Sequence, residues 1–314
     1  MSLNVAVQMD PIEPIDINAD STFRIMEEAQ ARGHKLFYYT PDMLSYEEGI
    51  ITAKGWDVTV QRELGKHAVK GEMRTVALAD FDVVWLRQDP PFDMGYITTT
   101  HLLERIHPET LVVNDPQWVR NHPEKLLILD FPDLMPPTTI ARDLEVLKSF
   151  KDKHKDIILK PLYGNGGAGV FRLGPEDRNL NSLHELFAGI NSEPLIAQKF
   201  LADVSKGDKR VILVDGKPVG AINRVPAKGE TRSNMHVGGR PEKIALDAND
   251  IRICDAIGPT LAASGHIFVG IDVIGGMLTE INVTSPTGIQ ELERFDGINV
   301  AEKIWDAIEA KRLS

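Results

Sequence analysis

Apolar runs alternate with a helical pattern along the first third of the chain. Residues 4–9 and 35–39 are short apolar runs typical of strands, and residues 21–32 between them carry apolar positions at helical spacing, with Gly33 just beyond. A third apolar run covers residues 81–86. Strands that alternate with helices predict a doubly wound parallel sheet. The first turn lacks the G-x-G-x-x-G pattern, so no dinucleotide site is indicated there.

A second α/β region follows a boundary that we expect near residues 116–125. Several of its strands are separated by turns that contain glycine, as in hairpins. The predicted strands are 136–140, 157–161, 170–172, 195–201, 207–214 and 218–224, and the predicted helices are 143–154, 250–263 and 299–311.

Residues 266–283 form the most informative pattern, two β-branched strands around a Gly-Gly turn, which predicts a hairpin. Three side chains with oxygen atoms lie on it: Asp272, Glu280 and Asn282. Hard oxygen ligands suit Mg²⁺ or Mn²⁺. The alternative is a half-buried hairpin with a polar outer face. The absence of Lys and Arg from that face favours the metal site.

The length of the turn decides whether these three side chains converge. A two-residue loop over residues 275–276 would put Asp272 and Glu280 on opposite faces, because side chains alternate along a strand. A three-residue loop over residues 275–277, with a bulge, places Asp272 opposite Glu280 and keeps Asn282 on the same face. We expect this longer loop because the other face is then almost wholly apolar. That face would consist of Val269, Ile271, Val273, Thr279, Ile281 and Val283.

Three loops are further candidates for ligand binding. Residues 162–169 hold four glycines between two predicted strands and directly follow Lys160 and Pro161, so the loop is either a phosphate-binding flap or a flexible hairpin tip. Residues 87–93 follow a predicted parallel strand, where α/β proteins place ligands, although a rigid Pro-Pro turn is the alternative. Residues 226–240 lack periodicity and predict a mobile lid.

Composition and charge narrow the class of protein. The 314 residues are 42% hydrophobic and 26% charged, which is typical of a globular protein with a sizeable core. The net charge of -11 argues against a nucleic-acid partner or an anionic membrane. The start of the sequence lacks the pattern of a signal peptide, and we expect a soluble cytoplasmic protein. The single cysteine, Cys254, lies in a helical pattern and is expected to be a buried apolar residue rather than a nucleophile.

Taken together, the motifs resemble those of the ATP-grasp ligases, and more closely those of the bacterial glutathione synthetase family. The similarity extends over nearly the whole chain. The motifs are DPPFD at 89–93, IILKPL at 157–162, GDKR at 207–210, GETR at 229–232, GGR at 238–240 and LTEINVTSPT at 278–287. The flap differs from the family pattern as we know it, because it has Tyr163, Gly164 and Asn165 where an Asp-Gly-Met-like sequence is expected.

The resemblance implies a fold and a reaction. The fold would be an N-terminal α/β domain over residues 1–122 and a two-lobed ATP-grasp region, with lobes at 123–200 and 201–314. The reaction would join γ-glutamylcysteine and glycine into glutathione through an acyl phosphate, giving ADP and phosphate, with ATP as substrate and Mg²⁺ or Mn²⁺ as cofactor. Relatives of this kind suggest a homodimer or homotetramer.

The resemblance also implies roles for individual residues. Arg210 would stabilise the transferring phosphoryl group, unless it forms a structural ion pair with Asp208. The expected metal ligands remain Asp272, Glu280 and Asn282. Nucleotide contacts are expected from Lys125, Lys160, Gly164, Gly166, Gly167, Gln198, Lys199, Phe200, Leu201 and Asp208. Substrate contacts are expected from Arg224, Arg232, Asn282, Ser285 and Thr287.

Two other functions stay open at this point. One is a different ATP-grasp carboxylate–amine ligase, of the D-alanine or glutamate-adding type. The other is a nucleotide-binding module without turnover. The lysines, the strand over 195–201 and the serine and threonine near 285–287 also have ordinary structural explanations, as solvated amines, a central strand and turn caps.

Overall fold

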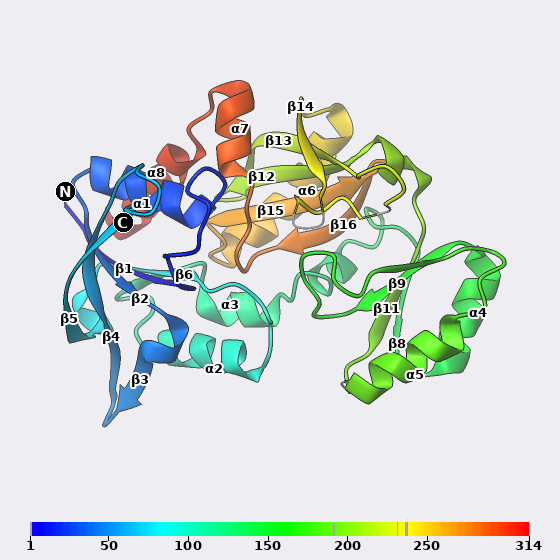
Figure 1. The fold of residues 1–314 in the computed structure, drawn as a ribbon, viewed down its shortest axis with the longest axis horizontal. Coiled ribbons are helices and arrows are strands. Elements are labelled where there is room, and N and C mark those ends of the chain that lie inside the picture. The colour runs from blue at the N-terminus through cyan, green and yellow to red at the C-terminus, as the bar shows by residue number, and fades with distance from the viewer. Residues whose placement is uncertain (1, 191, 231, 236–237, 314) are drawn as a thin grey trace.

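The computed structural model of the chain describes residues 2–190, 192–230, 232–235 and 238–313. Its strands form sheets of seven, four and five strands. In Figure 1 the seven-stranded sheet lies at the left, the four-stranded sheet at the right and the five-stranded sheet between them. No helix in the described ranges has the length and apolar character needed to span a bilayer.

The centre of the seven-stranded sheet is parallel, as the sequence predicts. β1 pairs in parallel with β2 and β6, and β6 pairs in parallel with β7. The bounds are β1 Asn4–Met9, β2 Lys35–Tyr39, β6 Val83–Arg87 and β7 Leu111–Val113, with helices α1 Ser21–Ala31, α2 Met94–Leu103 and α3 Pro116–Asn121. Asp20 caps α1 and Gly33 follows it with φ 81°.

One edge of this sheet is antiparallel, so the sheet is mixed rather than wholly parallel. β3 Leu44–Glu47, β4 Ile50–Val60 and β5 Ala68–Ala77 form the antiparallel edge beside β2. A two-residue turn at Glu48 and Gly49 joins β3 to β4, with positive φ at both positions. A connection this short permits only antiparallel pairing.

The four-stranded sheet is antiparallel throughout, in the order β10-β9-β11-β8. Its bounds are β8 Thr138–Ala141, β9 Ile157–Pro161, β10 Phe171–Leu173 and β11 Leu195–Lys199. Helices α4 Leu144–His154 and α5 Leu180–Ile190 cover it, and their residues Leu147 and Phe187 share a core with β9. The sequence pattern did not predict α5. In the proline-bounded segment 123–129, where the sequence pattern predicts a helix, the structure has a short 3₁₀ turn, η3 Leu127–Asp130.

The five-stranded sheet is also antiparallel, in the order β14-β13-β12-β15-β16. Its bounds are β12 Asp208–Val214, β13 Lys217–Val225, β14 Arg240–Ile244, β15 Phe268–Ile274 and β16 Met277–Asn282, with the 3₁₀ turn η4 Ala202–Lys206 before it. Helix α6 Ala248–Ala263 packs against it and contributes Cys254, which is buried as expected. Burial raises the pKa of this thiol to about 12, so it is a poor nucleophile.

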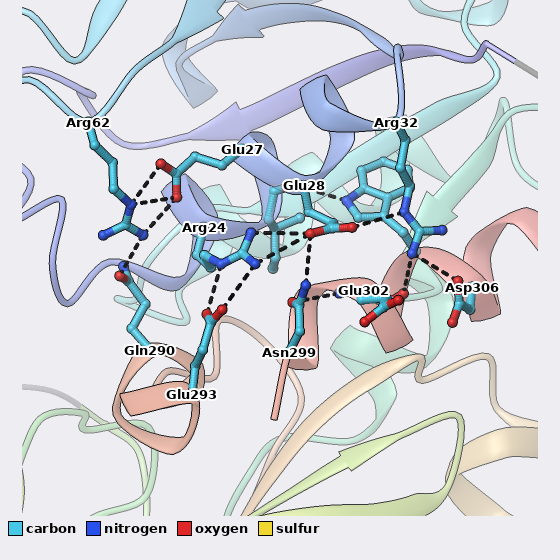
Figure 2. Close-up of polar contacts among 12 residues, drawn as sticks. Arg24, Glu27, Glu28, Arg32, Arg62, Gln290, Glu293, Asn299, Glu302 and Asp306 are labelled. Carbon is cyan, nitrogen blue, oxygen red and sulfur yellow. Dashed lines mark hydrogen bonds and ion pairs between the residues drawn. The ribbon is translucent and has the colours of Figure 1, made fainter. Parts of the chain in front are cut away.

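The last two helices return to the beginning of the chain. α7 Ile289–Asp296 and α8 Val300–Leu313 pack against α1, and the indole of Trp305 donates to the Ile25 carbonyl at 2.9 Å. Figure 2 shows the polar contacts at this junction, where Arg24 bridges Glu28 of its own helix and Glu293 of α7. The C-terminal helices therefore join the five-stranded sheet to the seven-stranded sheet.

Candidate active site

The hairpin of β15 and β16 has the predicted pairing but not the predicted loop. Asp272 lies opposite Glu280 and Gly270 opposite Asn282, which confirms the expected register. The turn itself has two residues, Gly275 and Gly276, both with positive φ (55° and 78°), as tight hairpin turns require. The expected three-residue loop is therefore wrong.

Thr279 is the extra residue that restores the register. The pairing shifts between Asp272 and Val273, so Thr279 stands as a bulge, and its hydroxyl donates to the Asp272 carbonyl at 3.1 Å. Leu278 takes the core position that the sequence pattern gave to Thr279. The physical reason is that a bulge changes the face on which side chains lie just as an extra loop residue does.

Two arginines hold the carboxylate of Asp272. Arg210 on β12 donates from Nε to Oδ1 at 2.6 Å and from Nη2 to Oδ2 at 3.3 Å, and Arg224 on β13 lies 3.0 Å from Oδ1. Burial opposes ionisation of Asp272, which is 3% exposed, but the two guanidinium groups hold its pKa far below the ordinary value. Asp272 is therefore ionised throughout the physiological range.

Two lysines surround the carboxylate of Glu280. Lys160 on β9 donates to Oε1 at 2.9 Å, and the Lys125 ammonium lies 3.8 Å from the same oxygen. Burial would raise the pKa of Glu280, but Lys125 and Lys160 lower it below its ordinary value. These contacts join the four-stranded sheet to the five-stranded sheet across the space between them.

The donor set suits a magnesium ion that also binds phosphate. Asn282 uses its amide nitrogen on the Gly270 carbonyl at 3.1 Å, which leaves its oxygen as the potential ligand beside Asp272 and Glu280. Across the described ranges, no group of three or more His, Cys, Asp or Glu side chains is arranged to hold a metal ion. Mg²⁺ commonly binds one or two carboxylates and completes its shell with substrate phosphates and water, so the hairpin fits that kind of site.

Asp208 belongs to the same charged network. Its Oδ2 accepts from Arg224 Nη2 at 2.5 Å and from the Ser233 hydroxyl at 2.6 Å. The alternative in which Arg210 pairs with Asp208 is wrong, because Arg210 pairs with Asp272 across the strands and Arg224 takes Asp208. Burial raises the pKa of Asp208 even with Arg224 beside it.

The glycine loop lies between two strands, as predicted, and reaches the lysine pair. Lys125 donates to the Gly164 carbonyl, and Arg232 donates to the Gly167 carbonyl at 3.3 Å. A Cβ on Gly169 would lie 2.9 Å from the ring of Pro161, so this position has no room for a side chain. Gly166 and Gly167 both have positive φ. The backbone of this loop can therefore approach a ligand closely.

A cavity of about 110 Å³ lies between the two sheets. Val170, directly after the glycine loop, lines it, whereas Lys125 and the glycines of the loop do not. Its walls combine apolar and charged groups and include most of the residues expected at a nucleotide. The residues from the prediction that line it are Lys160, Gln198, Lys199, Phe200, Leu201, Asp208, Arg232, Asp272 and Glu280. Gln198 donates to the Thr138 hydroxyl at 3.1 Å, so its side chain is engaged with the neighbouring strand.

The turn over residues 284–288 carries the remaining predicted substrate residues, Ser285 and Thr287. Arg210 donates to the Thr287 carbonyl at 3.4 Å, and Arg87 at the end of β6 donates to the Pro286 carbonyl at 3.0 Å. The sequence marked the loop that begins at Arg87 but gave no sign of this contact, because 199 residues separate the partners. The predicted lid also reaches the site through Arg232 and Ser233, although residues 231, 236 and 237 lie outside the described ranges.

Two antiparallel sheets that close on a cavity, with a glycine flap, two buried lysines and an acidic hairpin, define an ATP-grasp ligase. Solved structures share the whole fold. D-cycloserine synthetase DcsG matches with a TM-score of 0.71 at 14% identity, covering 98% of this chain and 100% of that one. The ATP-grasp ligase PsnB, in a complex with Mg and ADP, matches with a TM-score of 0.63 at 18% identity over all of both chains.

Sequence comparison then identifies the family. The chain belongs to the prokaryotic glutathione synthetase family, because the N-terminal domain of that family matches residues 3–120 and its ATP-grasp domain matches residues 124–297. The glutathione synthetase of Brucella melitensis biotype 1 is 59% identical over 312 residues, which cover 99% of this chain and 100% of the relative. That of Vibrio cholerae serotype O1 is 44% identical over 98% of each chain.

Proposed function

We propose that the chain is a glutathione synthetase, which ligates the cysteinyl carboxylate of γ-glutamylcysteine to the amine of glycine with ATP. The observation that carries this proposal is the buried network between the sheets. Asp208, Asp272 and Glu280 share it with four cations: Arg210, Arg224, Lys125 and Lys160. This concentration of cations suits a polyanionic substrate, and no protein nucleophile is needed for the reaction.

The nucleotide would occupy the cavity below the flap. Lys125 and Lys160 act on phosphate oxygens as point charges, while the backbone of Gly164, Gly166 and Gly167 covers the phosphates. The adenine lies against the β11 end, at Gln198, Lys199, Phe200 and Leu201, with Asp208 nearby. Asp272, Glu280 and Asn282 would hold Mg²⁺ or Mn²⁺, which neutralises phosphate charge when it is bound.

The peptide acid would lie beside the turn over residues 284–288. Arg210 grips oxygens of the phosphoryl group as it is transferred to the cysteinyl carboxylate. Arg224, Arg232, Asn282, Ser285 and Thr287 bind the carboxylates and peptide groups of γ-glutamylcysteine. Closure of the lid, residues 226–240, excludes water from the acyl phosphate. In this proposal residues 1–122, 123–200 and 201–314 are the domain and the two lobes of a cytoplasmic homodimer or homotetramer.

The test is ADP release from ATP and Mg²⁺ with γ-glutamylcysteine, with and without glycine. We expect full turnover only with both substrates, and a stoichiometric product of the mass of glutathione. Turnover with D-alanine or glutamate in their place would contradict the proposal and indicate another ligase. ATP binding without any acid-dependent ADP release would indicate a non-catalytic module.

A further inference from the structure

Glu124 is a carboxylate beside the reaction centre that the proposed mechanism leaves without a task. It directly precedes Lys125, and its backbone carbonyl accepts from the amide of Ile281, between Glu280 and Asn282. The side chain is half-buried, and its Oε1 accepts from the Thr284 hydroxyl at 2.5 Å. Glu124 therefore flanks the metal hairpin on the side of the 284–288 turn.

A small pocket of about 20 Å³ opens at this carboxylate, and Lys125 beside it is one of its walls. The other walls include Pro90 and Phe92 from the loop after β6, Tyr163 and Gly164 from the flap, and Thr284 from the turn. The rings of Phe92 and Tyr163 stack with centroids 5.8 Å apart and close one side. Since the flap is one of the walls, its movement during nucleotide binding would change the size of the pocket.

The remaining carboxylates around the hairpin are committed to cations. Asp208 pairs with Arg224, Asp272 with Arg210 and Arg224, and Glu280 with Lys160. Glu124 differs from them, because within the described part of the chain its side chain hydrogen-bonds only a neutral hydroxyl and forms no ion pair. It is thus the carboxylate of the four that is left to receive a cation from outside the protein.

The second substrate of the proposed reaction supplies such a cation. Glycine arrives as an ammonium ion, which the surrounding cations (Arg210, Arg224, Lys125 and Lys160) would repel and the Glu124 carboxylate would attract. This ammonium is not nucleophilic until it loses a proton. We propose that the pocket at Glu124 binds the acceptor amine and that Glu124 is the base that deprotonates it, an inference that rests on the proposed function.

The step balances as follows. The Glu124 carboxylate takes one proton from the ammonium, and the freed nitrogen lone pair forms the C–N bond to the acyl phosphate carbon. The bond from that carbon to the phosphoryl oxygen breaks, and phosphate leaves with the electron pair. A second nitrogen proton leaves with the phosphate. Burial, opposed by Lys125, raises the pKa of Glu124, as a base working near neutral pH requires.

Hydroxylamine separates this role from a structural one, because it is an uncharged nucleophile at neutral pH and needs no base. We expect Glu124→Gln to lower glycine-dependent turnover about 100-fold, the usual loss for a general base, while hydroxamate formation from γ-glutamylcysteine stays within about threefold of the unsubstituted enzyme. Glu176→Gln, at an exposed position, is the matched control and should change neither rate. Equal losses with glycine and hydroxylamine, or no loss with glycine, would overturn the inference.

Thr284→Val tests the same idea with a nearly isosteric change. The Thr284 hydroxyl lowers the pKa of Glu124, whereas Lys125, Arg210 and Glu280 also face this carboxylate and stay in place. Its removal should move the acid limb of the glycine pH profile to higher pH and leave the hydroxylamine profile unmoved. An unmoved glycine profile would contradict the role of Glu124. If the unsubstituted enzyme forms no hydroxamate from γ-glutamylcysteine, the proposed function itself is wrong.

Discussion

The ionisation state of each carboxylate at the cavity is determined by neighbouring charged side chains rather than by solvent. Asp272 is ionised because Arg210 and Arg224 contact it, and Glu280 because Lys125 and Lys160 lie beside it. Removing one partner from such a buried pair leaves an uncompensated charge, which costs more than the pair gains. Substitution of any of these side chains should therefore change the stability of the site as well as its chemistry.

Arg210 offers a test at this scale, since its fork contacts both oxygens of Asp272. Arg210→Lys keeps the charge but loses the planar grip. If Arg210 stabilises the transferring phosphoryl group, kcat should fall about 100-fold, a loss comparable to that of one transition-state donor, with little change in the KM for ATP. The measurement is steady-state ADP release with both co-substrates saturating.

The exposed Arg178 provides the matched comparison for this substitution. Arg178→Lys, at an exposed position outside the lid and the cavity, should leave kcat within a factor of about two, because surface substitutions outside a site usually have small effects. If Arg210→Lys raises KM and spares kcat, the guanidinium binds the ground state, and its proposed catalytic role is wrong.

At the scale of elements, the hairpin of β15 and β16 depends on two glycines in a left-handed conformation. A Cβ on Gly276, at φ 78°, would meet Asn249 Nδ2 at 3.1 Å. Gly276→Ala should therefore lower the free energy of unfolding by about 1–2 kcal/mol, the usual cost of alanine in this region. The measurement is the midpoint of urea unfolding, monitored with a probe on the five-stranded sheet.

Gly174→Ala is the comparison for the hairpin substitution, because nothing lies within 4 Å of its added Cβ and its φ is not positive. It should be neutral or slightly stabilising, since alanine restricts the unfolded chain. Equal effects of the two substitutions would mean that the turn at Gly276 is not strained by a side chain.

The local pattern of apolar and polar residues was sufficient to predict the long helices and strands and the register of the hairpin. The apolar alternation on both sides of Gly275 and Gly276 fixed which residues pair, but it could not distinguish a longer loop from the bulge at Thr279, since both restore the same register. The eight-residue helix α7 was missed because two helical turns are marginal alone and depend on packing, here of Ile289 and Leu292.

Contacts between segments far apart in the sequence could not be predicted from the local pattern of residues. Thr284 donates to Glu124 across 160 positions, and no spacing rule connects them. The same holds for Arg87 and the Pro286 carbonyl. The resemblance to a family pointed to charged residues that the structure brings together, whereas the contacts that orient them could be seen only in the assembled fold.

At the scale of the whole molecule, a buried histidine pair joins the residue after α3 to the segment before β15. The ring nitrogens of His122 and His266 lie 2.9 Å apart. Burial, and the proximity of His122, lower the pKa of His266 to about 3. An unfolded chain takes up the proton near its ordinary pKa of about 6.5, so the free energy of unfolding should fall between pH 6.5 and 3, by up to about 1.4 kcal/mol per pH unit for this group.

The His266→Phe variant removes that titration. Its free energy of unfolding should depend less steeply on pH between about 6 and 4 than that of the parent chain, whatever its absolute stability. Urea denaturation at four or five pH values gives the two slopes. The His101→Gln variant, at an exposed position on α2, should keep the parent slope. Identical slopes for His266→Phe and the parent would refute the neutral buried state.

The junction between α1 and the C-terminal helices carries the last prediction, because it ties residues near both ends of the chain together. Arg24 donates twice to Glu293, at 2.8 and 3.2 Å, and twice to Glu28, at 3.3 and 3.4 Å, and its side chain is only 13% exposed (Figure 2). Charged hydrogen bonds in partly buried positions stabilise more than surface pairs do, so Arg24→Ala should lower the unfolding free energy by about 1–2 kcal/mol. Lys66→Ala, which breaks the exposed pair with Glu63, should change it by less than about 0.5 kcal/mol. The difference between the unfolding free energies of the two variants should decrease only slightly from 0.1 to 1 M salt, since salt screens buried ion pairs poorly. If Arg24→Ala matches Lys66→Ala in urea denaturation, hydrophobic contacts such as that of Trp305, rather than this network, hold the ends of the chain together.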